Sequence, residues 1–154
     1  MNLVDELHSI AAALRALDIP YAICGGIAVT IYGATRTTKD IDLLIGRSDL
    51  PRSLEAIRPL GYVFAALPMT FDAGTERERH VQRVSKLEDK EHLILDLLLA
   101  EAAFEGLLAE RVHIDLPEGR LSVVPLHVLL AMKRLAARPQ DQADIEKLTS
   151  GDAS

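Results

Sequence analysis

The sequence of 154 residues contains a single cysteine, Cys24, and no tryptophan. One cysteine cannot form a disulfide within the chain, and it offers no cysteine cluster for zinc. No apolar run approaches the roughly 18 residues that would cross a bilayer. The opening residues, MNLVDELHSIAAAL, carry acids where a signal peptide would carry a basic leader. These absences predict a cytoplasmic protein without a membrane partner.

Positive charge is also scarce, because the formal net charge is −6. Such a chain has no overall attraction for nucleic acid, although a local basic surface is compatible with it. The composition, 49% apolar and 26% charged, is typical of a globular protein. The length predicts one domain over residues 1–149, followed by a frayed tail at 150–154.

Hydrophobic periodicity and turn residues predict a mixture of helices and strands. The class is therefore α/β (α+β), and we expect no repeats. Helices are expected over 3–17, 27–34, 48–61 (capped by Ser48 and ended by Gly61), 125–137 and 141–149. Strands are expected over 21–24, 39–45, 62–66, 81–84 and 92–99. A hairpin is expected over 112–124, and a loop over 69–80.

Two carboxylates interrupt the apolar strand predicted at 39–45. Alternation places Asp40 and Asp42 on one face of that strand, while Ile41 and Leu43 lie on the core face. Neighbouring carboxylates repel each other, and a bound cation would remove that repulsion. A solvated edge strand would also explain the pair.

A third acid, Asp96, stands inside the apolar run HLILDLLLA. A charge in such a strand needs a partner or a metal. If the two strands are neighbours, Asp40, Asp42 and Asp96 converge on one place, which suits one or two Mg²⁺ ions better than zinc. A structural ion pair from Asp96 to Arg36 or Arg83 is the alternative.

The dipeptide Gly25-Gly26 lies between the short strand and the next helix. Glycine allows backbone N–H groups to approach a ligand closely, and phosphate is a natural guest at a helix start. An ordinary strand–helix turn would have the same sequence. Together with the acids downstream, the pattern indicates a site for a nucleoside triphosphate.

The stretch from Tyr21 to Ile45 resembles the first motif of the nucleotidyltransferase fold superfamily, which is related in its core to DNA polymerase β. The run GGIAVTIYGATRTTKDIDLLI is similar to AbiEii-like nucleotidyltransferases, a group that includes toxins of toxin–antitoxin pairs. That group carries an Arg-x-Thr-x-Asp-Ile-Asp run, matched here by Arg36, Thr38, Asp40, Ile41 and Asp42.

Later parts of the chain resemble the superfamily more loosely. Asp96 matches its third carboxylate, and MKRLAARPQDQADIEKL resembles a helical Lys…Asp motif that would place Lys133 and Asp141 near the nucleotide, with Asp144 as another match. Gly26 stands where serine is common. For Lys133 a solvated helix face is the alternative, and for Arg36 a structural role.

The resemblance implies a fold with a mixed sheet flanked by helices, and an enzyme that transfers a nucleotide. Asp40, Asp42 and Asp96 would hold magnesium and perform catalysis, with Asp96 as general base. The triphosphate would be bound by Gly25, Gly26, Arg36, Thr38, Lys133 and Asp141.

Three functions agree with this sequence. The first is transfer to a macromolecule, tRNA or protein, by a toxin with a cognate antitoxin. The second is modification of a small molecule, as in antibiotic-modifying nucleotidyltransferases. The third is an inactive nucleotide-binding or partner-binding module, which the intact set of acids argues against.

Overall fold

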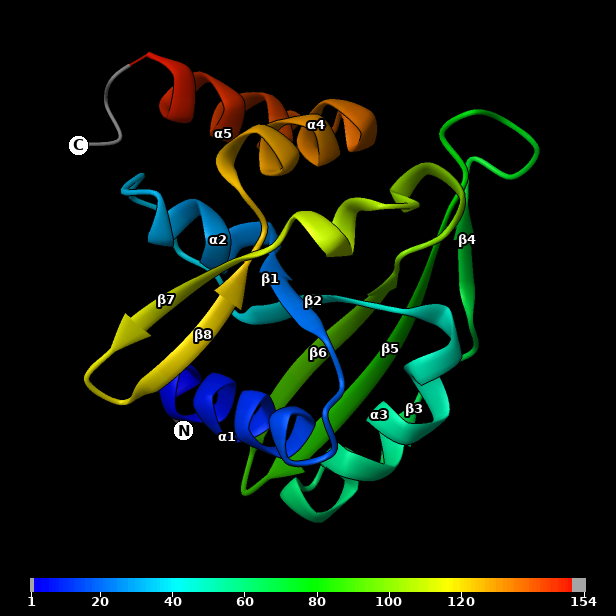
Figure 1. Cartoon of the computed structure of the whole chain (residues 1–154), viewed down its shortest axis with the longest axis vertical. Coiled ribbons are helices and arrows are strands. Elements are labelled where there is room, and N and C mark those ends of the chain that lie inside the picture. The colour runs from blue at the N-terminus through cyan, green and yellow to red at the C-terminus, as the bar shows by residue number, and fades with distance from the viewer. Residues whose placement is uncertain (1, 151–154) are drawn as a thin grey trace.

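The computed structural model describes residues 2–150. The tail expected to fray, 150–154, lies outside the described residues except for Ser150. The centre of the fold is an eight-stranded mixed sheet in the order β3-β5-β6-β2-β1-β8-β7, with β4 paired to β5 (Figure 1). The strands are β1 Tyr21–Cys24, β2 Asp40–Ile45, β3 Phe64–Ala65, β4 Met69–Phe71, β5 Arg79–Glu88, β6 Glu91–Leu99, β7 Val112–Leu116 and β8 Gly119–Val123.

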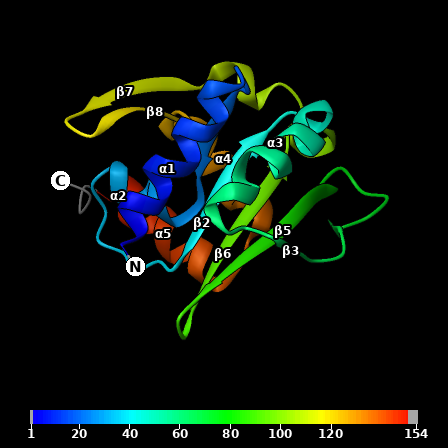
Figure 2. The same ribbon diagram turned by 90° about the horizontal axis from the view of Figure 1, so that it is seen from below.

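Helices cover both faces of this sheet. In Figure 1 and in the view from below in Figure 2, α1 and α3 lie on one face, whereas α4 and α5 lie on the other. The helices are α1 Leu3–Ala16, α2 Gly25–Ile31, α3 Leu50–Ile57, α4 Leu126–Ala136 and α5 Pro139–Thr149. A mixed sheet flanked by helices confirms the predicted α/β class.

The side chains of β2 alternate between the core and the opposite face of the sheet. Ile41, Leu43 and Ile45 are at most 1% exposed. They pair in parallel register with Leu95, Leu97 and Leu99 of β6, which are also buried. Burying side chains of this size contributes about 1.5–3 kcal/mol each. The intervening residues of both strands face α4, and the predicted acids are among them.

Several predicted elements have the expected type with shifted bounds. The hairpin is confirmed as β7 and β8, where Leu116 pairs with Gly119. The predicted helix at 48–61 consists of a 3₁₀ turn, then α3, then a second 3₁₀ turn, Arg58–Leu60. Gly61 ends it in the left-handed region, with φ of 103°. The predicted cap at Ser48 is wrong, because Ser48 lies inside the first 3₁₀ turn, Arg47–Asp49.

The prediction of a continuous loop over 69–80 is wrong at both ends. Met69–Phe71 form β4, and β5 begins at Arg79, so that Phe71 pairs with Arg79 across the ladder. Residues 72–78 between these strands are mostly polar and dominate the composition of the segment. The strands on either side are therefore not evident from the sequence. The strand expected at 62–66 is shorter, Phe64–Ala65.

None of the helices formed by residues 2–150 is long and apolar enough to cross a membrane.

Candidate active site

A cavity of about 400 Å³ opens between the sheet and the pair α4–α5. One wall comes from β2, β5 and β6, and the other from α4 and the start of α5. All the residues that the sequence assigned to catalysis or to the triphosphate line it, namely Gly25, Gly26, Arg36, Thr38, Asp40, Asp42, Asp96, Lys133 and Asp141. Asp144, the other match in the helical motif, is not among the residues that line the cavity. Segments as far apart in the sequence as α2 and α5 therefore contribute to one space.

The acids of the sheet wall are brought together by strand register. Asp42 of β2 lies directly opposite Asp96 of the parallel neighbour β6, and Asp40 lies two residues along the same face. Burial raises the pKa of Asp42 to about 7, and the charges of Asp96 and Asp40 add to the effect. The nearby cations Lys133 and Arg138 only partly offset this repulsion. The sheet wall thus carries negative charge that is incompletely neutralised.

Gly25 is required by the position of Asp42. Its φ is +65°, and a Cβ atom built there would lie 1.9 Å from Oδ2 of Asp42. Any side chain would therefore displace the carboxylate and also strain the backbone. Gly25 is the first residue of α2, so the expected Gly25-Gly26 turn is the start of the helix itself.

Gly26 has a similar relation to the segment before β2. A Cβ there would lie 2.8 Å from both Nη1 of Arg36 and Oγ1 of Thr38. Thr38 in turn donates a hydrogen bond to the carbonyl of Asp40, at 3.3 Å. The lack of a side chain at Gly26 lets this segment close over α2 and fixes the start of the acidic strand.

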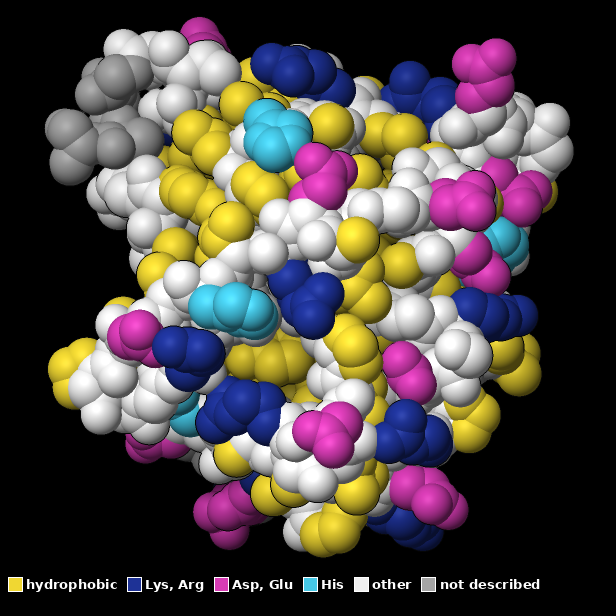
Figure 3. Space-filling model, viewed as in Figure 1, with side chains coloured by type: hydrophobic (Ala, Val, Ile, Leu, Met, Phe, Trp, Pro, Cys, Tyr) yellow, Lys and Arg dark blue, Asp and Glu magenta, His cyan; other side chains and the backbone are white. Residues whose placement is uncertain are grey.

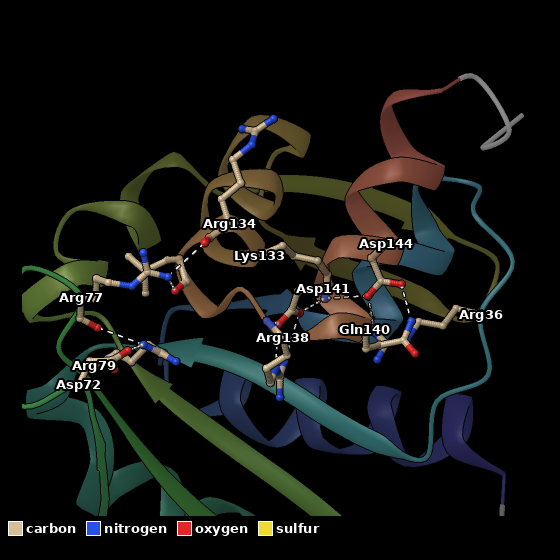
Figure 4. A network of polar contacts seen from close by, with 11 residues as sticks. Arg36, Asp72, Arg77, Arg79, Lys133, Arg134, Arg138, Gln140, Asp141 and Asp144 are labelled. Atoms are coloured by element: carbon tan, nitrogen blue, oxygen red, sulfur yellow. Dashed lines mark hydrogen bonds and ion pairs between the residues drawn. The ribbon is translucent and has the colours of Figure 1, made fainter.

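The helix wall holds a second charged cluster, which Figure 4 shows at the junction of α4 and α5. Lys133 is only 4% exposed, and its Nζ lies 3.2 Å from Asp141 and 3.0 Å from Asp144. Arg36 approaches Asp144 at 3.1 Å, and Gln140 donates to the other oxygen of Asp144 at 3.0 Å. The alternative of a solvated helix face for Lys133 is wrong, because α5 covers it.

Arg138 completes this cluster from the N-cap position, directly before α5. Its Nε donates to Asp141 at 2.7 Å and its backbone N–H donates to the same oxygen at 3.1 Å. Burial acts to raise the pKa of Asp141, but hydrogen bonds from Arg138 and the charge of Lys133 outweigh it and lower the pKa. The Arg138 side chain is still 70% exposed, so its guanidinium group borders the cavity.

Asp96 has an ion-pair partner in the ligand-free structure. Arg83 lies opposite it in the antiparallel pair of β5 and β6, and donates to both of its oxygens at 2.9 and 3.0 Å. Of the two partners considered from the sequence, Arg36 and Arg83, the structure has Arg83. Hydrogen bonding to Asp96 raises the pKa of Arg83, so the guanidinium stays charged.

Sequence reasoning did not assign cavity roles to Arg79, Arg83 or Arg138, although all three line the cavity. Arg79 and Arg83 are four residues apart on β5, so strand alternation places them on one face. That signal was hidden because residue 79 fell in the expected loop. Arg138 stands directly before Pro139, where a helix start can be expected.

The carboxylates of the sheet wall differ in how readily they could bind magnesium. Asp40 and Asp42 offer hard oxygen ligands, and the raised pKa of Asp42 reflects first its burial and then the repulsion from Asp96 and Asp40, which a cation would relieve. Both oxygens of Asp96 are engaged by Arg83. Within residues 2–150, no three His, Cys, Asp or Glu side chains are arranged around one metal position. Asp40 and Asp42 therefore fit an ion as they stand, and Asp96 fits one after Arg83 releases it.

No protein-family model matches the chain, and none of the curated proteins matches it in sequence. Solved structures do resemble it. The lincosamide antibiotic adenylyltransferase LnuA, solved with lincomycin bound, has a TM-score of 0.62 and 14% identity over 95% of this chain and 96% of its own. A candidate nucleotidyltransferase from Thermotoga maritima has a TM-score of 0.65 and 11% identity over 96% and 92%.

ANT(2'')-Ia, solved in complex with adenylyl-2''-tobramycin, has a TM-score of 0.56 and 15% identity, over 98% of this chain and 89% of its own. At these identities the likeness concerns the fold, and it extends over nearly the whole of each chain. The chain therefore has the fold of the nucleotidyltransferases.

Proposed function

We propose that this protein is a metal-dependent nucleotidyltransferase, which moves a nucleoside monophosphate from a triphosphate to an acceptor hydroxyl. The observation that carries the proposal is the grouping of Asp40, Asp42 and Asp96 on one wall of a cavity whose other wall presents cations. Acids alone would repel a triphosphate and cations alone would not hold a metal. The fold shared with LnuA and ANT(2'')-Ia supports the same chemistry.

In this reaction the acceptor oxygen forms a bond to the α-phosphorus, and the bond from that phosphorus to the pyrophosphate oxygen breaks. Pyrophosphate leaves with its electron pair, and the hydroxyl proton passes to a carboxylate. Asp96 is our candidate for that base, and its release requires Arg83 to exchange Asp96 for the triphosphate. Magnesium, when bound, supplies charge neutralisation at the phosphates. Asp40 and Asp42 would hold it.

The remaining residues would bind and orient the triphosphate. Backbone amides at Gly25 and Gly26, with Arg36 and Thr38, border the acidic strand. Lys133 and Asp141 would act mainly through Arg138, because their own charges are already paired. The exposed guanidinium of Arg138 would then contact a phosphate oxygen.

The acceptor that we favour is a small molecule, the class that antibiotic-modifying nucleotidyltransferases use. A cavity of about 400 Å³ suits a compound of that size. The match covers 96% of LnuA, and LnuA is solved with such a compound bound.

A macromolecular acceptor, tRNA or protein, is the second candidate and includes the toxin hypothesis with a cognate antitoxin. It is favoured by the resemblance to AbiEii-like enzymes in the first motif and by a hollow of about 360 Å³ whose lining includes Arg15, Arg111 and Arg120 beside a single acid, Asp18. Figure 3 shows Lys and Arg side chains with a histidine near the β7–β8 hairpin and the end of α1. Arginine clusters are a common footprint of phosphate-rich partners.

Thermal unfolding tests the proposed function. Mg²⁺ and a nucleoside triphosphate together should raise the melting temperature of the wild type, and the rise should disappear in Asp42→Asn. Asp89→Asn is the matched control, since Asp89 is exposed at the β5–β6 turn with a φ of 56° that Asn also adopts. An equal rise in all three proteins would contradict the site.

Label transfer separates the two acceptor classes. The protein is incubated with each α-labelled triphosphate, Mg²⁺ and either total RNA, cell protein or a panel of hydroxyl compounds. Growth arrest on expression, lost in Asp42→Asn, would favour the toxin. Equal growth of cells that express the wild type and cells that express Asp42→Asn, together with label on small molecules, would exclude the toxin hypothesis.

A further inference from the structure

A hollow of about 360 Å³ lies outside the cavity of the proposed active site, where the end of α1 meets the β7–β8 hairpin. In Figure 3 it is a depression with an apolar floor, bordered by Lys or Arg side chains and a histidine. Tyr21 begins β1 and Gly25 follows it, so the hollow and the cavity lie at opposite ends of β1 and share no residue. We call it the arginine hollow, and its polar lining consists of Arg15, Asp18, Tyr21, Arg111, His113, Arg120 and Ser122.

A buried tyrosine in this lining has a proton without an acceptor. β1 and β8 pair at one position only, Ile23 with Val123, and the N–H of Ser122 donates to the hydroxyl of Tyr21 at 3.2 Å. Tyr21 is only 3% exposed. A phenol oxygen that accepts a hydrogen bond still has its own proton to donate, and no group among residues 2–150 accepts it. Because a buried donor without an acceptor is unfavourable, this hydroxyl indicates a ligand that accepts a hydrogen bond.

Two arginines of the lining are held in place without being neutralised. Nη1 of Arg15 donates to the carbonyl of Arg120 at 2.6 Å, and Nη1 of Arg111 donates to the carbonyl of Leu108 at 3.1 Å. Neither has an acidic partner among the described residues. Each bond uses one N–H group, so the other N–H groups of both guanidinium groups are available to an anion.

The other charges of the lining do not cancel these two. Arg120 contributes little, because its Nε is paired with Asp115 at 2.8 Å and both side chains are largely exposed. Asp18 is the single acid that lines the hollow, and it forms no ion pair within residues 2–150. Two unpaired arginines against one aspartate leave the lining positive, in a chain whose net charge is −6.

We propose that the arginine hollow binds a phosphate monoester, as a second site that does not depend on the transfer reaction. The three terminal oxygens of a monoester accept hydrogen bonds from several directions, which suits two guanidinium groups and the hydroxyl of Tyr21. The volume of about 360 Å³ also holds a small organic body. The phosphate belongs either to a small phosphorylated compound or to the 5′-phosphorylated end of an RNA.

Three compounds with the same small body test this inference by direct binding. Glycerol 3-phosphate carries a phosphate, glycerate a carboxylate, and glycerol no charge. Each is titrated into the full chain without Mg²⁺ or nucleotide, and NMR follows the resonances of His113 and Ser122, which line the hollow. Glycerol 3-phosphate should bind at millimolar concentration, glycerate about tenfold more weakly, and glycerol not measurably.

Charge variants locate the phosphate in the hollow. Arg15→Gln and Arg111→Gln should each weaken binding of glycerol 3-phosphate about tenfold. Arg58→Gln is the matched control, because Arg58 is exposed, lines neither the hollow nor the cavity, and changes the net charge equally. Asp18→Asn should strengthen binding about threefold, whereas Asp89→Asn, at a similar positive φ on the β5–β6 turn, should leave it unchanged.

A variant that removes one hydroxyl tests the role of Tyr21. Tyr21→Phe should weaken binding of glycerol 3-phosphate about threefold. Tyr32→Phe is the control, because the hydroxyl of Tyr32 already donates to the carbonyl of Val124 and Tyr32 does not line the hollow.

Two RNA tetranucleotides of one sequence, with a 5′-phosphate or a 5′-hydroxyl, identify the source of the phosphate. An RNA end as the ligand predicts that the 5′-phosphorylated form binds more tightly than glycerol 3-phosphate and loses this affinity in Arg111→Gln. A small phosphorylated compound as the ligand predicts that neither RNA binds more tightly than glycerol 3-phosphate. Both results support a phosphate site.

Equal binding of glycerate and glycerol 3-phosphate to the wild type would overturn the inference. So would the absence of glycerol 3-phosphate binding at millimolar concentration. Binding that is lost in Arg138→Gln but kept in Arg111→Gln would also overturn it, because the phosphate would then lie in the cavity.

Discussion

The two walls of the cavity carry acidic residues in opposite electrostatic states. On the sheet wall, burial and the charges of Asp96 and Asp40 raise the pKa of Asp42 to about 7. On the helix wall, Asp141 is more deeply buried, yet hydrogen bonds and cations lower its pKa. The difference lies in the partners, since Lys133 and Arg138 contact Asp141 directly and only act on Asp42 from a distance.

This contrast distinguishes a structural charge cluster from a functional one. Lys133, Asp141, Asp144 and Arg36 neutralise one another and join α4, α5 and the segment before β2. Asp40 and Asp42 have no comparable partner among the described contacts, so their charge is available to a ligand. A buried charge without a partner is unfavourable for the free protein, and sites of ligand binding are where such a state is expected.

The largest expected effect follows from removing a carboxylate of the sheet wall. Asp42→Ala should lower nucleotide transfer by about 10³-fold, because a metal contributes several kcal/mol of stabilisation to the transition state. Transfer of label from an α-labelled triphosphate measures this. The variant should fold as well as the wild type, and a variant that keeps its activity would remove Asp42 from the chemistry.

A substitution in the helix wall should change the stability of the fold instead of the transfer reaction. Lys133→Met leaves Asp141 and Asp144 buried without a central cation, and such a loss costs about 3–5 kcal/mol. Urea unfolding measures the change. Lys90→Met is the control, because Lys90 is exposed at the β5–β6 turn, and it should be nearly neutral. Equal midpoints for both variants would show that the cluster is not structural.

The sign of pH dependence distinguishes the walls as well. Asp42 has a pKa of about 7 in the folded chain, against 3.8 for an ordinary aspartate. The folded state therefore binds more protons, and its stability should fall as pH rises from about 4 to 7, by at most about 4 kcal/mol. Asp42→Asn should remove this slope. Unfolding measured without divalent ions checks it, and a wild type that gains stability across that window would contradict the raised pKa.

A glycine substitution gives the smallest of these effects. Gly25→Ala should cost about 1–2 kcal/mol from its positive φ, and it should also abolish the thermal response to Mg²⁺ and triphosphate by displacing Asp42. Gly74→Ala has the same backbone strain, with φ of +77°, but open space around its Cβ. It should keep the response. A response retained in Gly25→Ala would show that Asp42 need not occupy its present position.

Local sequence was sufficient to predict the core strands and the shared face of Asp40 and Asp42. Alternation in DIDLLI separates the carboxylates from the apolar core face, and the run around Asp96 has the same form. The hairpin at 112–124 and the last two helices also follow from local turn residues. These features depend on neighbours in sequence, where periodicity is informative.

Pairings between distant residues were not accessible in that way. The sequence left Arg36 and Arg83 as alternative partners of Asp96, and the choice of Arg83 depends on the register of β5 against β6. The burial of Lys133 depends on α5 folding back over α4. A lysine in polar surroundings is typical of a surface, so composition alone favoured solvent for Lys133. β4 and the start of β5 were missed for the same reason, because they lie in a polar segment.

Binding of a divalent ion in the absence of nucleotide tests the central claim most directly. Mn²⁺, followed by electron paramagnetic resonance above pH 7, should bind the wild type and Asp89→Asn alike, and binding should be lost in Asp42→Asn. Mn²⁺ that binds Asp42→Asn as tightly as the wild type would contradict a sheet wall whose unbalanced charge is there to hold a cation.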